Sequence, residues 1–377
     1  MIIAIPKENI PGENRVAVNP ANVKELIKAG LSVKVESGAG RGLHILDQNY
    51  KDAGATIVED QAELLQNADI VLKVNHPIKN EADMLKDNSI FVSLFQTTKE
   101  TEAVKKLVSK KITGFSMHLI PRTTLAQKMD ALSSQSNIAG YKAVLTGSTH
   151  LGVYMPLLMT AAGTIPPAKV LVLGAGVAGL QAIATAKRLG AQVEAFDVRP
   201  EVKEQVESLG AKFVEISSDA DDGVGEGGYA KETSDEYKKQ QSELIKSHIA
   251  KSDMVITTAL IPGRPAPILI SKDMVEKMKP GSVIMDLAAE NGGNCALTEK
   301  DRVVIVYNVT IDGTANIPST VPIHATQLYS KNITSFISYL FKDGELNLDL
   351  DDEIISGAMF THNGAITHEP TKEALNR

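Results

Sequence analysis

The chain has 377 residues, of which 43% are hydrophobic and 23% are charged, and its net charge is −7 at neutral pH. A chain of this length exceeds what one hydrophobic core usually supports, so we expect two domains. The negative charge, the absence of tryptophan and an aromatic content of 4% argue against nucleic acid as a partner.

Three further classes of site are disfavoured by the residue patterns. The single cysteine, Cys295, cannot form an internal disulfide, which is typical of a reducing compartment, and we interpret it as a small loop residue. The eight histidines show no metal-binding spacing, so no metal site is predicted. No secretory signal is visible, and prolines and glycines interrupt the apolar stretch Leu151–Ala168, which argues against a membrane span.

The N-terminal part of the chain alternates short apolar runs with amphipathic segments, a pattern typical of a parallel α/β sheet. Asn19 followed by Pro20 predicts the start of a helix, and Gly30 predicts its end. The predicted strands of this first domain are Ile2–Ile5, Ser32–Glu36, Ile70–Val74, Ile90–Leu94 and Ile112–Met117.

A long helical pattern follows from Thr124 to about Thr160, and we interpret it as the connection between the two domains. Its first part carries a polar stripe that would share one helical face, made of Gln127, Asp130, Ser133 or Ser134, and Asn137. A solvent-exposed face is the simplest interpretation. Amides, hydroxyls and a single carboxylate, with Arg122 just ahead, also suit the orientation of a carboxamide and a ribose.

The most informative segment is an apolar strand that runs into Gly174, Gly176 and Gly179, followed by a helix and a second strand ending at Asp197. The glycines predict a tight turn, close approach of the backbone to a pyrophosphate, and close helix packing, with the phosphates at the helix N-terminus. Asp197 suits both ribose hydroxyls and would repel a 2′-phosphate, so NAD is favoured over NADP. Arg199 is interpreted as a ribose or adenine neighbour, although an arginine nearby can serve a 2′-phosphate.

The rest of the chain predicts the remaining strands of a nucleotide-binding sheet and a C-terminal segment that returns to the first domain. Further strands are expected at Lys212–Val214, Met254–Thr257, Ser282–Asp286 and Val303–Val306. A helix over Pro322–Phe341 precedes a hairpin of Ile354–Phe360 and Ala365–Thr367 that turns at Asn363 and Gly364. The acidic, glycine-rich stretch Ser217–Lys231 is interpreted as a solvated loop or as a lid over a cofactor.

We therefore expect an α/β protein with two doubly wound, Rossmann-like parallel-sheet domains, the first discontinuous and completed by the C-terminal segment. The expected boundaries are residues 1–135 plus 320–377 for the first domain and 136–319 for an NAD-binding domain.

Several motifs together resemble the NAD(H)-binding component of proton-translocating nicotinamide nucleotide transhydrogenase, over essentially the whole chain. They are PRTTLAQKMDALSSQSNIAGYKAV, VLGAGVAGLQAIATAKRLGAQVEAFDVR, GGYAKE, TTALIPGRPAP and DLAAENGGNC. The resemblance implies direct hydride transfer between NAD(H) here and NADP(H) on a partner subunit, coupled to proton movement across the membrane. It also implies a homodimer that is cytoplasmic and peripheral on the inner face of the cell membrane. We expect the membrane-spanning and NADP(H)-binding subunits to be separate polypeptides.

The same resemblance implies roles for individual residues. The nicotinamide end would be held, as the catalytic set, by Arg122, Gln127, Asp130 and Ser133. The pyrophosphate would lie against Gly174, Gly176, Val177 and Gly179, and the adenosine against Asp197, Val198 and Arg199. A mobile loop would include Gly228 and Tyr229, and further nucleotide contacts would come from Gln241 and Leu260.

Two alternatives stay open. Alanine dehydrogenase shares this fold and the opening PKE…ENRVAV pattern, and Arg15 and Lys73 match positions that hold its substrate carboxylate; here they are interpreted as solvated or paired bases. Its catalytic histidine has no counterpart in Ile90–Thr98, whereas hydride exchange needs only proximity and orientation. A non-catalytic NAD-sensing module is the second alternative, and the complete Arg122–Ser133 set argues against it.

Overall fold

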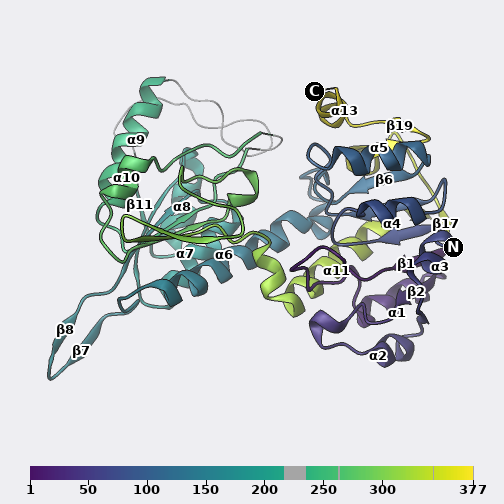
Figure 1. The fold of residues 1–377 in the computed structure, drawn as a ribbon, viewed down its shortest axis with the longest axis horizontal. Helices are drawn as coiled ribbons and strands as arrows, with labels where there is room; N and C mark the ends of the chain where they lie inside the picture. Colours follow the sequence, from purple (N-terminus) through teal and green to yellow (C-terminus); the bar gives the residue numbers. More distant parts are fainter. Residues whose placement is uncertain (216–234, 262–263, 343, 377) are drawn as a thin grey trace. The chain divides into compact units, whose positions relative to one another are not determined.

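The computed structural model describes residues 1–215, 235–261, 264–342 and 344–376, and it divides into two compact units. Unit 1 contains Met1–Gln135 and Ser319–Arg377, and unit 2 contains Ser136–Pro318. Each unit is built around its own sheet (Figure 1). Because the C-terminal segment belongs to unit 1, that unit is discontinuous in sequence, as the sequence predicts.

The sheet of unit 1 is doubly wound, with strand order β19-β18-β6-β5-β4-β1-β2-β3. The six strands from β3 to β6 are parallel, and the order reverses between β1 and β4. β18 runs antiparallel to β6 and adds the C-terminal segment to the sheet. The bounds are β1 Ile2–Ile5, β2 Ser32–Glu36, β3 Thr56–Val58, β4 Ile70–Leu72, β5 Ile90–Ser93, β6 Thr113–Ser116, β18 Met359–His362 and β19 Ala365–Ile366.

Helices pack on this sheet, and local capping explains where the first of them begins. The Asn19 side chain accepts a hydrogen bond from the Asn22 N–H at 3.0 Å, and Pro20 occupies the first turn, as the sequence predicts. Gly30 follows the helix end with φ +87. The helices are α1 Pro20–Lys28, α2 Asp47–Asp52, α3 Gln61–Gln66, α4 Lys79–Met84, α5 Thr101–Ser109, α11 Pro322–Tyr339, α12 Glu353–Ala358 and α13 Glu369–Leu375.

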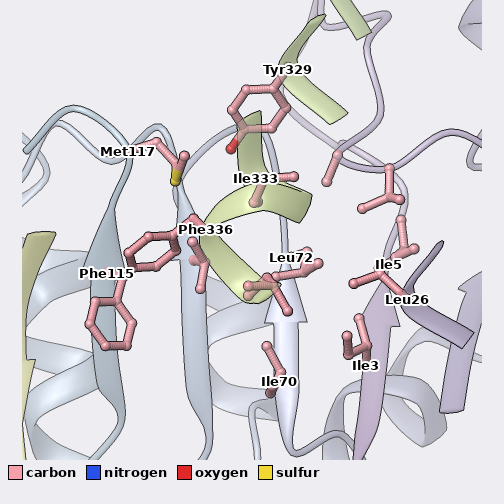
Figure 2. Packing of buried hydrophobic residues seen from close by; sticks show 14 of the residues in the cluster. Ile3, Ile5, Leu26, Ile70, Leu72, Phe115, Met117, Tyr329, Ile333 and Phe336 are labelled. Atoms are coloured by element: carbon pink, nitrogen blue, oxygen red, sulfur yellow. The ribbon is translucent and has the colours of Figure 1, made fainter. Parts of the chain in front are cut away.

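The core of unit 1 is completed by α11, which lies across one face of the sheet (Figure 2). Phe336 packs edge-on against Phe115 of β6, with ring centroids 5.2 Å apart. The Tyr329 hydroxyl donates to the Lys73 carbonyl at 2.7 Å, which satisfies a buried polar group beyond the end of β4. The C-terminal segment therefore contributes core residues to the N-terminal sheet.

Unit 2 contains a second doubly wound sheet, with strand order β11-β10-β9-β12-β13-β15-β14. All pairs are parallel except β14, an antiparallel edge strand. The strands are β9 Lys169–Leu173, β10 Gln192–Phe196, β11 Lys212–Phe213, β12 Met254–Thr257, β13 Val283–Asp286, β14 Val303–Val306 and β15 Val309–Asp312. The helices are α6 Ala131–His150, which begins in unit 1, α7 Val177–Arg188, α8 Lys203–Ser208, α9 Asp235–Ile249 and α10 Lys272–Glu276.

The expected long helix from Thr124 to Thr160 is wrong at both ends. A 3₁₀ turn at Gln127–Met129 precedes α6, and α6 ends at His150. Beyond it, β7 (Leu158–Thr160) and β8 (Gly163–Ile165) form a hairpin that projects from the rest of unit 2 (Figure 1). Gly152 and Pro156 interrupt the helical pattern, because glycine is a poor helix former and proline removes a backbone donor.

The expected strand Ile354–Phe360 is also wrong over Ile354–Ala358, where α12 forms instead; only Met359 and Phe360 lie in a strand, β18. The Asp352 side chain caps this helix by accepting from the Ile354 and Ile355 N–H groups at 2.8 and 2.9 Å. The predicted turn is confirmed, since Asn363 and Gly364 have φ +49 and +79 before β19. Besides β7 and β8, four short strands were not predicted: β3, β15, and the pair β16 (Phe341–Lys342) and β17 (Glu345–Leu346), which form a small hairpin.

Candidate functional site

The glycine turn after β9 has the geometry that its sequence predicts. Gly174 has φ +101, and a Cβ there would lie 2.6 Å from the Thr258 hydroxyl. A Cβ on Gly179 would lie 1.8 Å from the Gly174 carbonyl oxygen, so only glycine lets α7 pack this closely on the turn. A Cβ on Gly176 would meet only Arg199, at 3.8 Å. The turn therefore leaves backbone accessible at its middle glycine.

The N-terminus of α7 follows directly from this turn. Gly176 is its N-cap with an extended backbone, and no side chain caps the first turn. Val177, the first helical residue, is 39% exposed. The first N–H groups of a helix have no intrahelical partner, and the helix dipole favours negative charge there. The residues present thus fit a dinucleotide pyrophosphate.

Asp197 lies just beyond β10 and faces the same turn. One of its carboxylate oxygens accepts from the Ala175 N–H at 2.7 Å, inside the glycine turn. Arg199 donates to the same carboxylate from its backbone N, Nε and Nη2, each at 2.9 Å. Both carboxylate oxygens of Asp197 therefore accept two hydrogen bonds each, and the residue is 9% exposed. The neighbouring Val198 is half-buried. The sequence placed Arg199 near Asp197 but did not predict this pairing.

The loops after β12 and β13 meet beside the glycine turn. Thr258 donates from Oγ1 to the Gly174 carbonyl at 3.0 Å, and Leu260 is 45% exposed two residues later. Asp286, at the end of β13, holds the loop that carries Asn294. These three polar residues, Thr258, Asp286 and Asn294, were missed by the sequence reasoning. Asp286 ends a parallel strand and Thr258 directly follows one, and ligands bind at the carboxyl ends of such strands. This position is the signal by which the sequence could have indicated these two residues.

The proposed nicotinamide set lies in unit 1, around the start of α6. Gln127 and Arg122 are exposed, and Asp130 is half-buried between the 3₁₀ turn and α6. Asp130 caps α6, because its two carboxylate oxygens accept from the Ser133 N–H at 2.9 Å and from the Ser133 hydroxyl at 2.6 Å. The expectation of one continuous helical face is therefore wrong, since Gln127 and Ser133 stand on different elements.

The remaining predicted contacts are distributed over unit 2. Gln241 is half-buried on α9. Gly228 and Tyr229, with the whole of the predicted lid Ser217–Lys231, lie outside the described residues. Cys295 is buried, and burial raises the pKa of its thiol, so the thiolate form is disfavoured.

Arg15 and Lys73 belong to a buried cluster of charges in unit 1. Lys73 Nζ donates to both oxygens of Glu81 at 2.8 and 2.9 Å and lies 3.6 Å from Glu8. Arg15 donates from Nε and Nη2 to the two oxygens of Glu13, at 2.7 and 2.6 Å. All of these side chains are at most 5% exposed in their ion pairs. Both bases are therefore paired, as the sequence reasoning favoured.

The pKa values in this cluster follow from burial and charge. Burial alone would raise the pKa of Glu13, but the charge and hydrogen bonds of Arg15 outweigh it and hold the pKa at about 2. Burial raises the pKa of Glu8, against the opposing effect of Lys73. Burial alone would lower the pKa of Lys73. The charges of Glu8 and Glu81 outweigh this effect, so the pKa of Lys73 is raised above its ordinary value.

Metal clusters and membrane-spanning helices are both absent from the described part of the chain. No group of three or more metal-ligating side chains is found in these residues. Among the described helices, none combines the length and the apolar character that crossing a bilayer requires.

Family profiles match most of the chain. The profile described as "Alanine dehydrogenase/PNT, N-terminal domain" matches residues 4–139, and "Alanine dehydrogenase/PNT, C-terminal domain" matches residues 143–369. The second profile extends into the C-terminal segment, although from Ser319 onwards this segment packs in unit 1.

Individual relatives cover nearly the whole chain. A Rhodospirillum rubrum protein named as a part of NAD(P) transhydrogenase subunit alpha is 49% identical over 376 residues, which is 98% of both chains. A crystal structure of the transhydrogenase from Sinorhizobium meliloti has a TM-score of 0.88 and 44% identity, covering 97% of this chain and 100% of that one. The alanine dehydrogenase of Staphylococcus saprophyticus is 31% identical, covering 100% of this chain and 97% of that protein. These similarities confirm the resemblance inferred from the sequence motifs.

Proposed function

The chain belongs to the alanine dehydrogenase/PNT family, and within it we propose that this protein is the NAD(H)-binding subunit of a proton-translocating transhydrogenase. In this role it would pass hydride directly between its own NAD(H) and NADP(H) held by a partner subunit. The observation that carries the proposal is the 49% identity, over 98% of both chains, to a protein named as a portion of a transhydrogenase alpha subunit. The glycine turn and Asp197 support the cofactor assignment.

The adenosine end of the cofactor would be held at Asp197. The Ala175 N–H and the backbone N–H of Arg199 orient the carboxylate, and the ribose hydroxyls would replace the bonds from the Arg199 side chain. Hydroxyl groups can donate to a carboxylate, whereas a 2′-phosphate cannot and repels it. This difference supports NAD(H) over NADP(H) as the ligand of this chain.

The nicotinamide end would be held by Arg122, Gln127, Asp130 and Ser133. When bound, the dihydronicotinamide would supply a hydride, which carries both electrons and one hydrogen, so no protein group has to move a proton. Asp130 and Ser133 are already tied to each other, and this fixes the orientation of the carboxylate before any ligand arrives. Orientation of this kind is the contribution that direct transfer requires.

We extend the proposal to partners and location. A homodimer would dock on a membrane-spanning subunit and on an NADP(H)-binding subunit, at the inner face of the cell membrane. The hairpin β7–β8 and the segment before it support association with another chain, because Leu157, Met159 and Ile165 are 53%, 72% and 42% exposed. We assign this apolar surface to the homodimer contact.

Alanine dehydrogenase remains the second candidate, because a relative with that name is 31% identical over the full chain. Segment Ile90–Thr98 contains no histidine. The ring of His76 lies 6.1 Å from that of Phe95 in this segment, and the Nε2 of His76 lies 3.4 Å from Glu100. Amine oxidation needs a group that accepts a proton from the substrate.

The experiment that separates the two candidates uses the purified chain. Calorimetric titration should show NADH binding, and mixing with NAD⁺ and alanine should give no NADH absorbance. Robust alanine-dependent reduction of NAD⁺ would replace the transhydrogenase proposal with the dehydrogenase. Failure to bind NADH would remove both.

A further inference from the structure

Three neighbouring strands of unit 2 end at the same edge of the sheet and are tied together there by side chains. β9 leads into the glycine turn, β12 into the segment Thr258–Pro267, and β13 into the segment Leu287–Asn294. The strand order reverses between β9 and β12, so this edge is the switch point at which doubly wound sheets bind ligands. Residues 262 and 263 of the second segment lie outside the described part of the chain.

Asn294 connects the second and third of these segments. Its side chain is inaccessible to solvent, with Oδ1 accepting from the Ala259 N–H at 3.0 Å. Its Nδ2 donates to the Ala259 carbonyl at 2.9 Å and to the Pro267 carbonyl at 2.8 Å. One amide thus ties Ala259 to Pro267, on either side of the two residues that lie outside the described part of the chain. Only a side-chain amide offers an acceptor and two donors in this arrangement.

Asp286 fixes Asn294 in turn. Its Oδ2 accepts from the N–H groups of Asn294 and Cys295 at 2.8 and 3.0 Å and from the Thr298 hydroxyl at 2.6 Å. Its Oδ1 accepts from the Thr257 hydroxyl and the Ala288 N–H, both at 3.0 Å. Five donors to a carboxylate that is 1% exposed make this the rigid base of the arrangement.

The loop held by Asn294 presents apolar side chains to solvent. Leu260 is 45% exposed and Ile261 is 36% exposed. One residue before Ala259, Thr258 donates to the Gly174 carbonyl and links this segment to the glycine turn. In sheets of this type β9 to β11 form one mononucleotide half and the strands from β12 form the other. The loop therefore belongs to the half opposite Asp197.

We propose that Asn294 is a positioning residue for the nicotinamide half of the bound dinucleotide. It sets the place of Ala259 and so of the adjoining Leu260 and Ile261, whose apolar surface a planar ring can lie against. Asp286 holds Asn294 for this purpose without touching the ligand. The inference rests on the proposed function, because it requires that the chain binds NAD(H).

The test compares Asn294→Asp with the unmodified chain, using NADH and AMP as probes in calorimetric titrations. The change keeps the size of the side chain but replaces two donors by an oxygen that faces two carbonyls. We expect the Kd for NADH to rise about tenfold or more, the order of effect of one buried polar mismatch. AMP contacts only the half that contains Asp197, so its Kd should stay within about twofold.

The matched control is Asp253→Asn, at the opposite edge of the same sheet. Asp253 accepts from the Lys169 N–H at 2.7 Å and pairs with Lys279 at 2.7 Å, so the change loosens the sheet away from the site. We expect this variant to leave both Kd values unchanged even where its Tm falls as far as that of Asn294→Asp.

The outcomes separate the inference from the function on which it rests. Equal losses for NADH and AMP in Asn294→Asp, or unchanged NADH affinity, would overturn the positioning role. An unmodified chain that does not bind NADH would instead remove the proposed function. Where Asn294→Asp does not fold, Thr258→Val decides, because it removes the hydrogen bond that ties the residue before Ala259 to the glycine turn. NADH affinity that matches the unmodified chain would then contradict the inference.

Discussion

At the scale of single residues, we propose that Asp197 determines which dinucleotide the chain prefers. Its carboxylate is oriented by the Ala175 N–H and neutralised by Arg199, so it is a fixed acceptor at the end of β10. A carboxylate in this position selects for ribose hydroxyls and against a 2′-phosphate. The adjacent arginine would favour the phosphate once the carboxylate is absent.

Cofactor choice should therefore change in Asp197→Ala. We expect NADH affinity to fall and NADPH affinity to rise, because the negative charge of Asp197 is removed while the positive charge of Arg199 beside it remains and attracts a 2′-phosphate. Titration of both cofactors measures the ratio of the two Kd values, and Glu201→Ala, an exposed residue in the next turn, is the control. An unchanged ratio would show that Asp197 does not read the ribose.

A second prediction at this scale concerns the Glu13–Arg15 pair. Glu13 has a pKa of about 2 in the folded chain against an ordinary 4.5, so its charge stabilises the fold fully above pH 4.5 and progressively less as the pH falls towards 2. Glu13→Gln should cost about 3 kcal/mol at pH 7, because it removes the buried ion pair between Glu13 and Arg15. The difference should shrink below pH 4.5.

Urea unfolding at pH 7 and at pH 3 measures this effect. The control Glu102→Gln breaks an exposed pair with Lys105 and should cost less than about 0.5 kcal/mol. A cost for Glu13→Gln that is equal at both pH values would contradict the assigned role of its charge.

At the scale of elements, the sequence was most informative where burial is continuous. Ile2–Ile5, Met254–Thr257 and the helix at Pro20 were predicted correctly, because buried parallel strands read as apolar runs and caps mark a helix start. The hairpin β7–β8 could not be recognised, since its mostly exposed residues follow no core pattern. The helix α12 was read as a strand because its apolar residues are too few to distinguish the two periods.

The candidate site also contains residues that could be predicted from the sequence and residues that could not. The glycines and Asp197 could be predicted because each has a separate role in a known strand–turn–helix motif. The pairing of Asp130 with Ser133 depends on a break between the 3₁₀ turn and α6, which the helical pattern concealed. Asn294 could not be assigned from sequence, because the three hydrogen bonds of its side chain reach two residues that lie 27 and 35 positions away along the chain.

The hairpin β7–β8 gives a prediction about assembly. Met159 is 72% exposed, so Met159→Glu should leave the isolated chain folded but place a charge in the proposed dimer contact. Light scattering should then show a lower molar mass than for the unmodified chain. Ile305→Glu, at a residue 73% exposed on β14, is the matched control and should keep the original mass. An unchanged mass for Met159→Glu would place the dimer contact elsewhere.

At the scale of the whole molecule, the two units divide the proposed work. Unit 2 carries the glycine turn and Asp197, and unit 1 carries Arg122, Gln127 and Asp130. If unit 1 orients the nicotinamide and unit 2 supplies most of the affinity, changes in unit 1 should slow transfer more than they weaken binding. Asp130→Asn suits this comparison, because asparagine caps a helix as well as aspartate does.

The most direct measurement mixes the chain with a transhydrogenase NADP(H)-binding component and follows hydride exchange between NADH and an NADP analogue. The account predicts exchange with the unmodified chain, and a reduced rate at near-normal NADH affinity for Asp130→Asn and Gln127→Asn. Equal losses of rate and affinity would show that these residues only bind the cofactor and do not orient it for transfer. The absence of any exchange with the unmodified chain, while it still binds NADH, would contradict the central claim that this protein passes hydride from one nicotinamide to another.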